Sequence, residues 1–167
     1  SYTGAFSMAA AKGGAITTSV DLASRSLEKT RENFTINNID PDKHEIVVED
    51  IFLYFKEAKK KNTKFDMVIL DPPSFATSKE NRFSAAKDYT NLLKLAIDIT
   101  EENGIIVAST NCATFNMDKF KKFVDTAFEE TNIGYQLLEE FSLPTDFRVN
   151  EKFPEGNYLK VLFIKRL

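Results

Sequence analysis

Strand-like and helix-like segments alternate along this chain, and the alternation limits the folds that it can adopt. Four short β-rich segments are each followed by a segment of helical periodicity, and two more strand-like segments come last. Strands that alternate with helices form βαβ units, with the strands parallel and helices on both faces of the sheet. We therefore predict an α/β fold with a doubly wound, mostly parallel sheet. The expected strands are 15–22, 44–50, 65–71, 103–110, 135–143 and 158–167, and the expected helices are 24–38, 51–61, 85–100 and 116–130.

Polar side chains stand at the ends of the first four expected strands. Three of these strands end in Asp21, Asp50 and Asp71, and the fourth ends in the polar residues 110–112. The carboxyl ends of parallel strands meet at one edge of a sheet, where open α/β sheets bind their ligands. One acid in such a place is commonly a helix cap. Three in succession, followed by a polar fourth end, indicate a binding cleft.

Composition excludes several kinds of site. The chain has 167 residues, enough for a core without cross-links. A single cysteine and a single histidine rule out a disulfide framework and a Cys- or His-based metal centre. No apolar run approaches the roughly 18 residues of a membrane span, and no secretory signal is visible. We predict one cytoplasmic domain with neither metal nor membrane association, and its net charge of −3 gives no overall attraction to nucleic acid.

The first two acids suit a nucleoside ligand that has no phosphates. Asp21 stands where nucleotide-binding sheets place the acid that accepts hydrogen bonds from ribose hydroxyls, and Asp50 could accept one from an adenine amino group. Capping of the next helix is the alternative for both, with Ser24 as a further N-cap candidate. The first turn contains Gly4 but lacks the GxGxxG and GK[ST] patterns, which disfavours dinucleotides and nucleoside triphosphates. S-adenosylmethionine, with ribose and adenine but no pyrophosphate, fits this set.

A rigid segment, DPPSF, follows the third expected strand at residues 71–75. A strand end that only had to turn would more often use Gly, Asn or Ser. The two prolines fix two φ angles and hold the neighbouring carboxylate and aromatic side chains stiffly. This arrangement indicates a binding surface.

Four segments together resemble one family. SYTGAFSMAAAKGGA, SVDLASRSLEKTRENF, DPPSFATSKENRFSAAKDY and FPEGNYLK are similar to the class I S-adenosylmethionine-dependent methyltransferase domain of the large-subunit ribosomal RNA cytosine-C5 methyltransferases. The similarity covers nearly the whole chain, and the long third match is specific. It implies a Rossmann-like, seven-stranded methyltransferase sheet, S-adenosylmethionine as methyl donor and ribosomal RNA as substrate. A homodimer is one arrangement that the sequence allows.

The resemblance also implies which residues form the site. The implied cofactor-binding residues are Tyr2, Gly4, Phe6, Asp21, Asp50 and Asp71. The implied segment beside the sulfonium is Asp71, Pro72, Pro73 and Phe75. There Asp71 orients the cofactor or the target base, and Phe75 stacks on a nucleotide that has been flipped out of its helix. Lys79 and Arg82, in the loop that follows, are candidate phosphate contacts.

The chain departs from the family pattern in two places. The family has a buried strand directly before the loop at residues 1–6, and an RNA-binding domain before that strand. We therefore expect residues 1–167 to be the methyltransferase domain of a longer protein. The family's cysteine follows the fourth strand, but here Asn111 takes its place and Cys112 comes one residue later. A shift of one residue can turn a side chain to the opposite face.

Three functions remain open. Cytosine-C5 methylation needs a cysteine thiolate that adds to C6 of the base. Cys112 is either that nucleophile or a small buried thiol. An RNA N-methyltransferase would instead use residues 71–75 and Asn111 without a covalent intermediate. The third function is a non-catalytic module that binds the cofactor or RNA. The resemblance favours the first, and a Cys112→Ser variant separates the first two.

Overall fold

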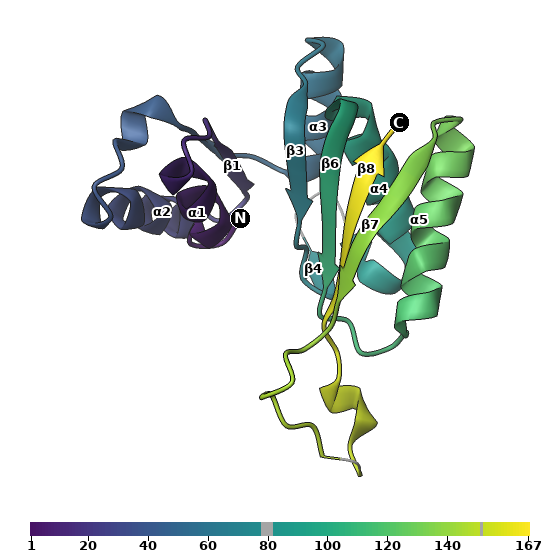
Figure 1. Ribbon diagram of the computed structural model, residues 1–167. Helices are drawn as coiled ribbons and strands as arrows, with labels where there is room; N and C mark the ends of the chain where they lie inside the picture. The colour runs from purple at the N-terminus through teal and green to yellow at the C-terminus, as the bar shows by residue number, and fades with distance from the viewer. Residues whose placement is uncertain (78–81, 151) are drawn as a thin grey trace. The chain divides into compact units, whose positions relative to one another are not determined.

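The chain forms two compact units, Ser1–Glu57 and Ala58–Leu167 (Figure 1). This is a computed structural model that describes residues 1–77, 82–150 and 152–167. None of the described helices is long and apolar enough to cross a membrane.

The first unit packs one helix on a pair of parallel strands and a second helix on the first. Its elements are α1 (Ala5–Lys12), β1 (Thr18–Asp21), α2 (Ser24–Ile36), the 3-10 turn η1 (Pro41–Lys43), β2 (Glu45–Val48) and most of α3 (Ile51–Lys60). β1 and β2 pair in parallel, with Asp21 opposite Val48. Helix α2 contacts both strands and also α1, and it buries Leu27 and Phe34 as its apolar spacing predicts.

The second unit is a four-stranded mixed sheet with two long helices. Its strands, in spatial order, are β3 (Phe65–Leu70), β6 (Thr100–Thr110), β8 (Lys160–Arg166) and β7 (Tyr135–Phe141). β3 is parallel to β6, and β8 is antiparallel to both of its neighbours. Helices α4 (Ala85–Ile99) and α5 (Met117–Thr131) pack against each other, and α4 contacts β6 (Figure 1). Three of the four strands therefore run in one direction.

The core of the second unit lies between this sheet and the two helices. Five residues along one side of α4 are buried: Tyr89, Leu92, Leu93, Ala96 and Ile99. The Tyr89 hydroxyl donates a hydrogen bond to the Ser109 carbonyl (2.6 Å), and its ring meets Phe120 edge-on. This bond satisfies a fully buried hydroxyl and attaches the helix to the end of β6.

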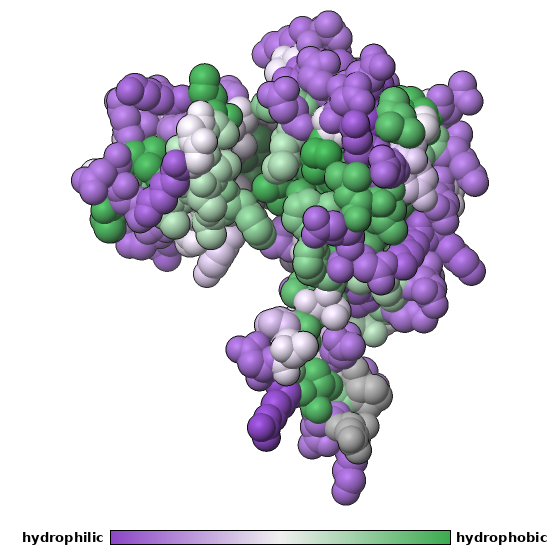
Figure 2. All heavy atoms as spheres, viewed as in Figure 1, coloured by the Kyte–Doolittle hydropathy of each residue, from purple (hydrophilic) through white to green (hydrophobic). Residues whose placement is uncertain are grey.

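The other face of the sheet exposes apolar side chains. Side chains alternate between the two faces of a strand, so Val68 is buried while Met67 and Ile69 are exposed. Figure 2 shows hydrophobic residues gathered over the strands of this unit.

The predicted α/β class is confirmed, and the predicted elements occur in the expected order, with local differences. Among the described residues the strands do not form one continuous sheet, because β1 and β2 pair apart from the other four. A short hairpin, β4 (Phe75–Thr77) and β5 (Arg82–Ser84), follows the DPPS residues and was not predicted. Ser24 is not the N-cap of α2, because Ala23 takes that position and Ser24 is already helical.

Candidate functional site

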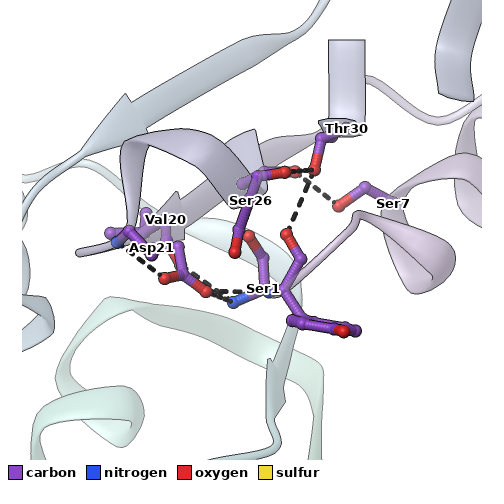
Figure 3. Close-up of polar contacts among 9 residues, drawn as sticks. Ser1, Ser7, Val20, Asp21, Ser26 and Thr30 are labelled. Atoms are coloured by element: carbon purple, nitrogen blue, oxygen red, sulfur yellow. Dashed lines mark hydrogen bonds and ion pairs between the residues drawn. The ribbon is translucent and has the colours of Figure 1, made fainter. Parts of the chain in front are cut away.

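Residues 1–4 form a tight loop that is attached to β1 and α2 (Figure 3). Tyr2 and Gly4 both have left-handed backbones, with φ of 50° and 78°. The Thr30 hydroxyl donates to the Tyr2 carbonyl (3.3 Å), and the Asn33 side-chain amide donates to the following carbonyl (3.0 Å). A Cβ on Gly4 would lie 2.4 Å from Cγ2 of Thr30, so this position requires glycine.

The Asp21 carboxylate lies against the beginning of this loop (Figure 3). Its Oδ2 accepts a hydrogen bond from the Tyr2 amide at 2.8 Å, and its Oδ1 accepts one from the Ala23 amide at 2.9 Å. Burial disfavours the charged form of this carboxylate, whereas the hydrogen bonds from the Tyr2 and Ala23 amides favour it. The side chain is therefore an ionised acceptor at the end of β1, which suits the hydroxyls of a ribose.

Asp50 follows β2 and stands at the start of α3. Its Oδ1 accepts a hydrogen bond from the Phe52 amide (2.9 Å), as the carboxylate of a helix N-cap does. Tyr2 and Phe6 are exposed aromatic residues of the same unit. The five residues assigned in this unit are two carboxylates, a glycine and two aromatic residues, with no cation among them. This set fits a cofactor that has a ribose and an adenine but no phosphate.

In the second unit, residues 71–75 lead from β3 into the hairpin. Asp71 is exposed, and Phe75 is 68 % exposed. The Ser74 carbonyl accepts a hydrogen bond from the Ala85 amide at the start of α4 (3.0 Å). The Ser74 hydroxyl donates to Oδ1 of Asn111 (2.8 Å). The DPPSF segment and the end of β6 are therefore directly connected.

The side chains of Asn111 and Cys112 point in opposite directions, one to the surface and one to the interior. The Asn111 side chain is exposed, whereas Cys112 is only 1 % exposed. The Cys112 Sγ lies 3.1 Å from the Thr114 hydroxyl, and its amide donates to the Thr110 hydroxyl (3.2 Å). The shift of one residue thus leaves the asparagine at the surface and the thiol in the interior.

Lys160, which the sequence interpretation did not assign, lies beside Cys112. Its Nζ donates to the carbonyls of Cys112 (3.0 Å) and Tyr158 (2.6 Å), and it lies 5.3 Å from the ring centroid of Phe115. The residue is 4 % exposed. Burial lowers the pKa of Lys160, and the nearby Cys112 thiol acts in the opposite direction. One feature of the sequence could have revealed this residue: Lys160 lies two residues before Leu162 on one strand, so it shares a strand face with a buried residue.

The predicted residues fall into two groups, one in each unit. The cofactor-binding candidates Tyr2, Gly4, Phe6, Asp21 and Asp50 belong to the first, and Asp71, Pro72, Pro73, Phe75, Asn111 and Cys112 belong to the second. Arg82 is exposed on β5, and Lys79 lies outside the described residues. Two shallow surface depressions, one on α2 and one between α5 and β7, include none of these candidates. In the described part of the chain, no group of three or more His, Cys, Asp or Glu residues could hold a metal ion.

The chain is similar to known methyltransferases over almost its whole length. A family model described as S-adenosylmethionine-dependent methyltransferase matches residues 1–160. "Putative ribosomal RNA large subunit methyltransferase YwbD" of Bacillus subtilis (strain 168) is 59 % identical over 167 residues, which are 99 % of this chain and 42 % of that protein. "Ribosomal RNA large subunit methyltransferase I" of Aeromonas salmonicida (strain A449) is 32 % identical over 166 residues, again 99 % of this chain and 42 % of that protein. The chain thus spans about two fifths of the length of these relatives.

Solved structures give the same result. "SMU.776, a putative methyltransferase complexed with SAH" superposes with a TM-score of 0.91 at 45 % identity and covers 98 % of this chain and 43 % of that one. "A putative sam-dependent methyltransferase from Streptococcus mutans" has a TM-score of 0.87 at 44 % identity and covers 98 % and 42 %.

Proposed function

This chain belongs to the S-adenosylmethionine-dependent methyltransferase family, and on that premise we propose that it methylates a nucleobase of large-subunit ribosomal RNA. The family identifies S-adenosylmethionine as the cofactor, and the names of the relatives support ribosomal RNA as the substrate. The exposed Phe75 beside Asp71 supports a nucleobase target. A base must leave its stack before a ring atom can react, and an aromatic side chain offers it a new stacking surface.

The positions of Asn111 and Cys112 are the basis on which we choose between methylation of a nitrogen and methylation of a carbon. When bound, S-adenosylmethionine supplies an electrophilic methyl group, which a nitrogen lone pair can accept directly. Carbon C5 of cytosine is a poor nucleophile and first needs a thiolate at C6. Cys112 is buried and next to Thr114, whereas Asn111 is exposed and next to Ser74. We therefore favour methylation of a base nitrogen without a covalent intermediate. Cytosine C5, which the family resemblance suggests, is the second candidate.

Each residue at this side of the site has a role that follows from its chemistry. The Asn111 amide can both donate and accept hydrogen bonds, which suits the edge of a base. Asp71 accepts a hydrogen bond from an amino group and favours the positive charge that a methylated ring nitrogen gains. Pro72 and Pro73 fix the backbone between Asp71 and Phe75, so both side chains keep their positions when a flat ring enters.

Mass spectrometry of ribosomal RNA nucleosides tests this proposal. The cells would lack the gene, or carry the full-length gene as wild type, Cys112→Ser or Asn111→Ala. We expect deletion to remove one N-methylated nucleoside, which wild type and Cys112→Ser restore and Asn111→Ala does not. Loss of 5-methylcytidine without rescue by Cys112→Ser would establish the covalent C5 route instead. An unchanged nucleoside profile after deletion would contradict the choice of ribosomal RNA.

A further inference from the structure

Lys160 and Thr110 are partners across two antiparallel strands, and the ends of both strands adjoin the candidate site. Thr110 is the last residue of β6, Lys160 is the first residue of β8, and they lie directly opposite each other. Opposite residues in an antiparallel pair point to the same face of the sheet. Both side chains are buried there.

These two side chains hold the backbone of Cys112 from both sides. The Thr110 hydroxyl accepts a hydrogen bond from the Cys112 amide (3.2 Å), and the Lys160 ammonium donates one to the Cys112 carbonyl (3.0 Å). With both backbone polar groups bound, the residue has little freedom to rotate. The orientation of Asn111, one residue earlier, is then restricted as well.

A buried ammonium group is costly unless its hydrogen bonds are made. Lys160 makes two bonds to carbonyls and lies over the Phe115 ring. A hydrophobic side chain would fill the same space without desolvating a charge, but it could not bind the two carbonyls. The distinctive contribution of a lysine here is therefore to link the segment after β6 with the residues just before β8.

We propose that Lys160 is a positioning residue, which keeps Asn111 turned towards Ser74 and Cys112 turned into the core. This inference rests on the proposed function, because Asn111 is the residue that would contact the target base. Lys160 itself need not touch substrate or cofactor.

Thiol labelling of the full-length protein tests the structural part of the proposal, that Lys160 keeps Cys112 in the core, and it needs no RNA. Iodoacetamide would be added, and the modified Cys112 peptide followed by mass spectrometry. Loss of the lysine frees the Cys112 backbone to open, so we expect Lys160→Met to label about tenfold faster than wild type and Thr110→Val about threefold faster. Lys165→Met removes a lysine from the opposite face of the same strand and is the matched control, with an expected wild-type rate.

Turnover on ribosomal RNA tests the functional half. We expect Lys160→Met to lower kcat about tenfold and to leave KM for S-adenosylmethionine unchanged, because the cofactor-binding candidates of the first unit are untouched. Lys160→Arg keeps the charge and the donors and should recover part of kcat. A merely structural lysine would change the thermal midpoint and both kinetic constants together.

The outcomes separate the two proposals. Labelling of Lys160→Met and Thr110→Val at the wild-type rate would overturn the positioning role, whatever the RNA result. Thr110→Val, which keeps the side-chain shape, decides the question if Lys160→Met does not fold. Fast labelling of the variants, together with a wild-type protein that methylates no ribosomal RNA, would support the positioning role and contradict the proposed substrate.

Discussion

Single residues in this chain differ in how much of their role can be read from the sequence. The one-residue offset of Cys112 left two roles open, a nucleophile or a small buried thiol, and the structure places the side chain in the interior. Its contact with Lys160 does not, because the two residues are 48 positions apart in the chain and local periodicity says nothing about such distant pairs. Gly4 was expected to permit close approach of a ligand, yet its nearest contact is Thr30 of its own unit. Packing against Thr30 therefore requires glycine here, and the close approach of a ligand stays a prediction.

Substitution of Gly4 by alanine should destabilise the protein through both backbone strain and collision. A left-handed backbone costs an alanine about 1 kcal/mol, and the overlap with Thr30 adds about 2 kcal/mol. Gly14 is the matched control, because its φ is 92° and a Cβ there would meet no described atom within 4 Å. We expect Gly4→Ala to lower the free energy of unfolding by about 3 kcal/mol and Gly14→Ala by about 1 kcal/mol in urea titrations. Equal effects would contradict the packing role.

Phe75 should contribute stacking and little else. Its side chain is largely exposed, so Phe75→Ala leaves no cavity in the core. Stacking of a base on an aromatic ring contributes about 1–3 kcal/mol, so Phe75→Ala should raise KM for RNA by about fivefold or more. Phe75→Tyr keeps the ring and should behave like wild type. If Phe75→Tyr is as impaired as Phe75→Ala, stacking is not its role.

At the scale of elements, the long periodic segments were predictable and the shortest strands were not. Helix α4 has 15 residues, enough for its buried side to repeat several times. Strands β4 and β5 have three residues each, too few to show an alternation. The end of α5 was predicted to within one residue. The packing of α5 against β7 was not, because it depends on a tertiary contact. There Tyr135 of β7 stacks on Phe128 and donates a hydrogen bond to Asp125.

This contact between α5 and β7 should make stability depend on pH in the alkaline range. Burial, the bond to Asp125 and the charges of Asp125 and Glu129 raise the pKa of Tyr135 from 10.0 to about 12. Between these values the unfolded tyrosine has lost its proton while the folded one keeps it, so stability falls as the pH rises. The contribution is fully present below pH 10 and is lost as the pH passes about 12.

The measurement is the free energy of unfolding of wild type and Tyr135→Phe from pH 8 to pH 11, with a spectroscopic titration of tyrosinate. We expect the difference between the two proteins to shrink above pH 10, and the variant to lack one tyrosine that titrates near pH 12. A difference that is constant over this range would contradict the assignment. Tyr158→Phe is the control, since that side chain makes no contact with Asp125 in the described structure.

At the scale of the whole molecule, the alternation of strands and helices predicted the fold class because it constrains every connection at once. It did not predict the division into two units, since periodicity does not say which strands become neighbours. The predicted cofactor-binding residues other than Asp71 belong to Ser1–Glu57, and Asp71 and the base-contacting candidates belong to Ala58–Leu167. Binding of cofactor and binding of RNA should thus be separable by mutation.

Replacement of Asp21 should weaken cofactor binding and leave RNA binding unchanged. Asp21→Asn removes a charged acceptor, and hydrogen bonds to charged groups contribute about 1.5–3 kcal/mol, so the affinity for S-adenosylhomocysteine should fall at least about tenfold. In wild type, ligand at about a hundred times its Kd adds about 2.7 kcal/mol to stability, and the variant should lose half of this gain or more. Calorimetry and thermal unfolding would measure both effects. Asp42→Asn, an exposed carboxylate of the same unit that pairs with Arg31, is the control and should bind as wild type does.

The hydrogen bond from Ser74 to Asn111 sets a condition on any incoming base. In the free protein the serine hydroxyl already occupies the acceptor of the asparagine amide, at 2.8 Å. An amide oxygen can accept two hydrogen bonds, so the serine leaves one position on this oxygen for a donor of an incoming base. The same bond fixes which way the amide faces, and therefore where its NH2 group meets an acceptor of the base. The order of donor and acceptor that a base must match is thus set before the base arrives.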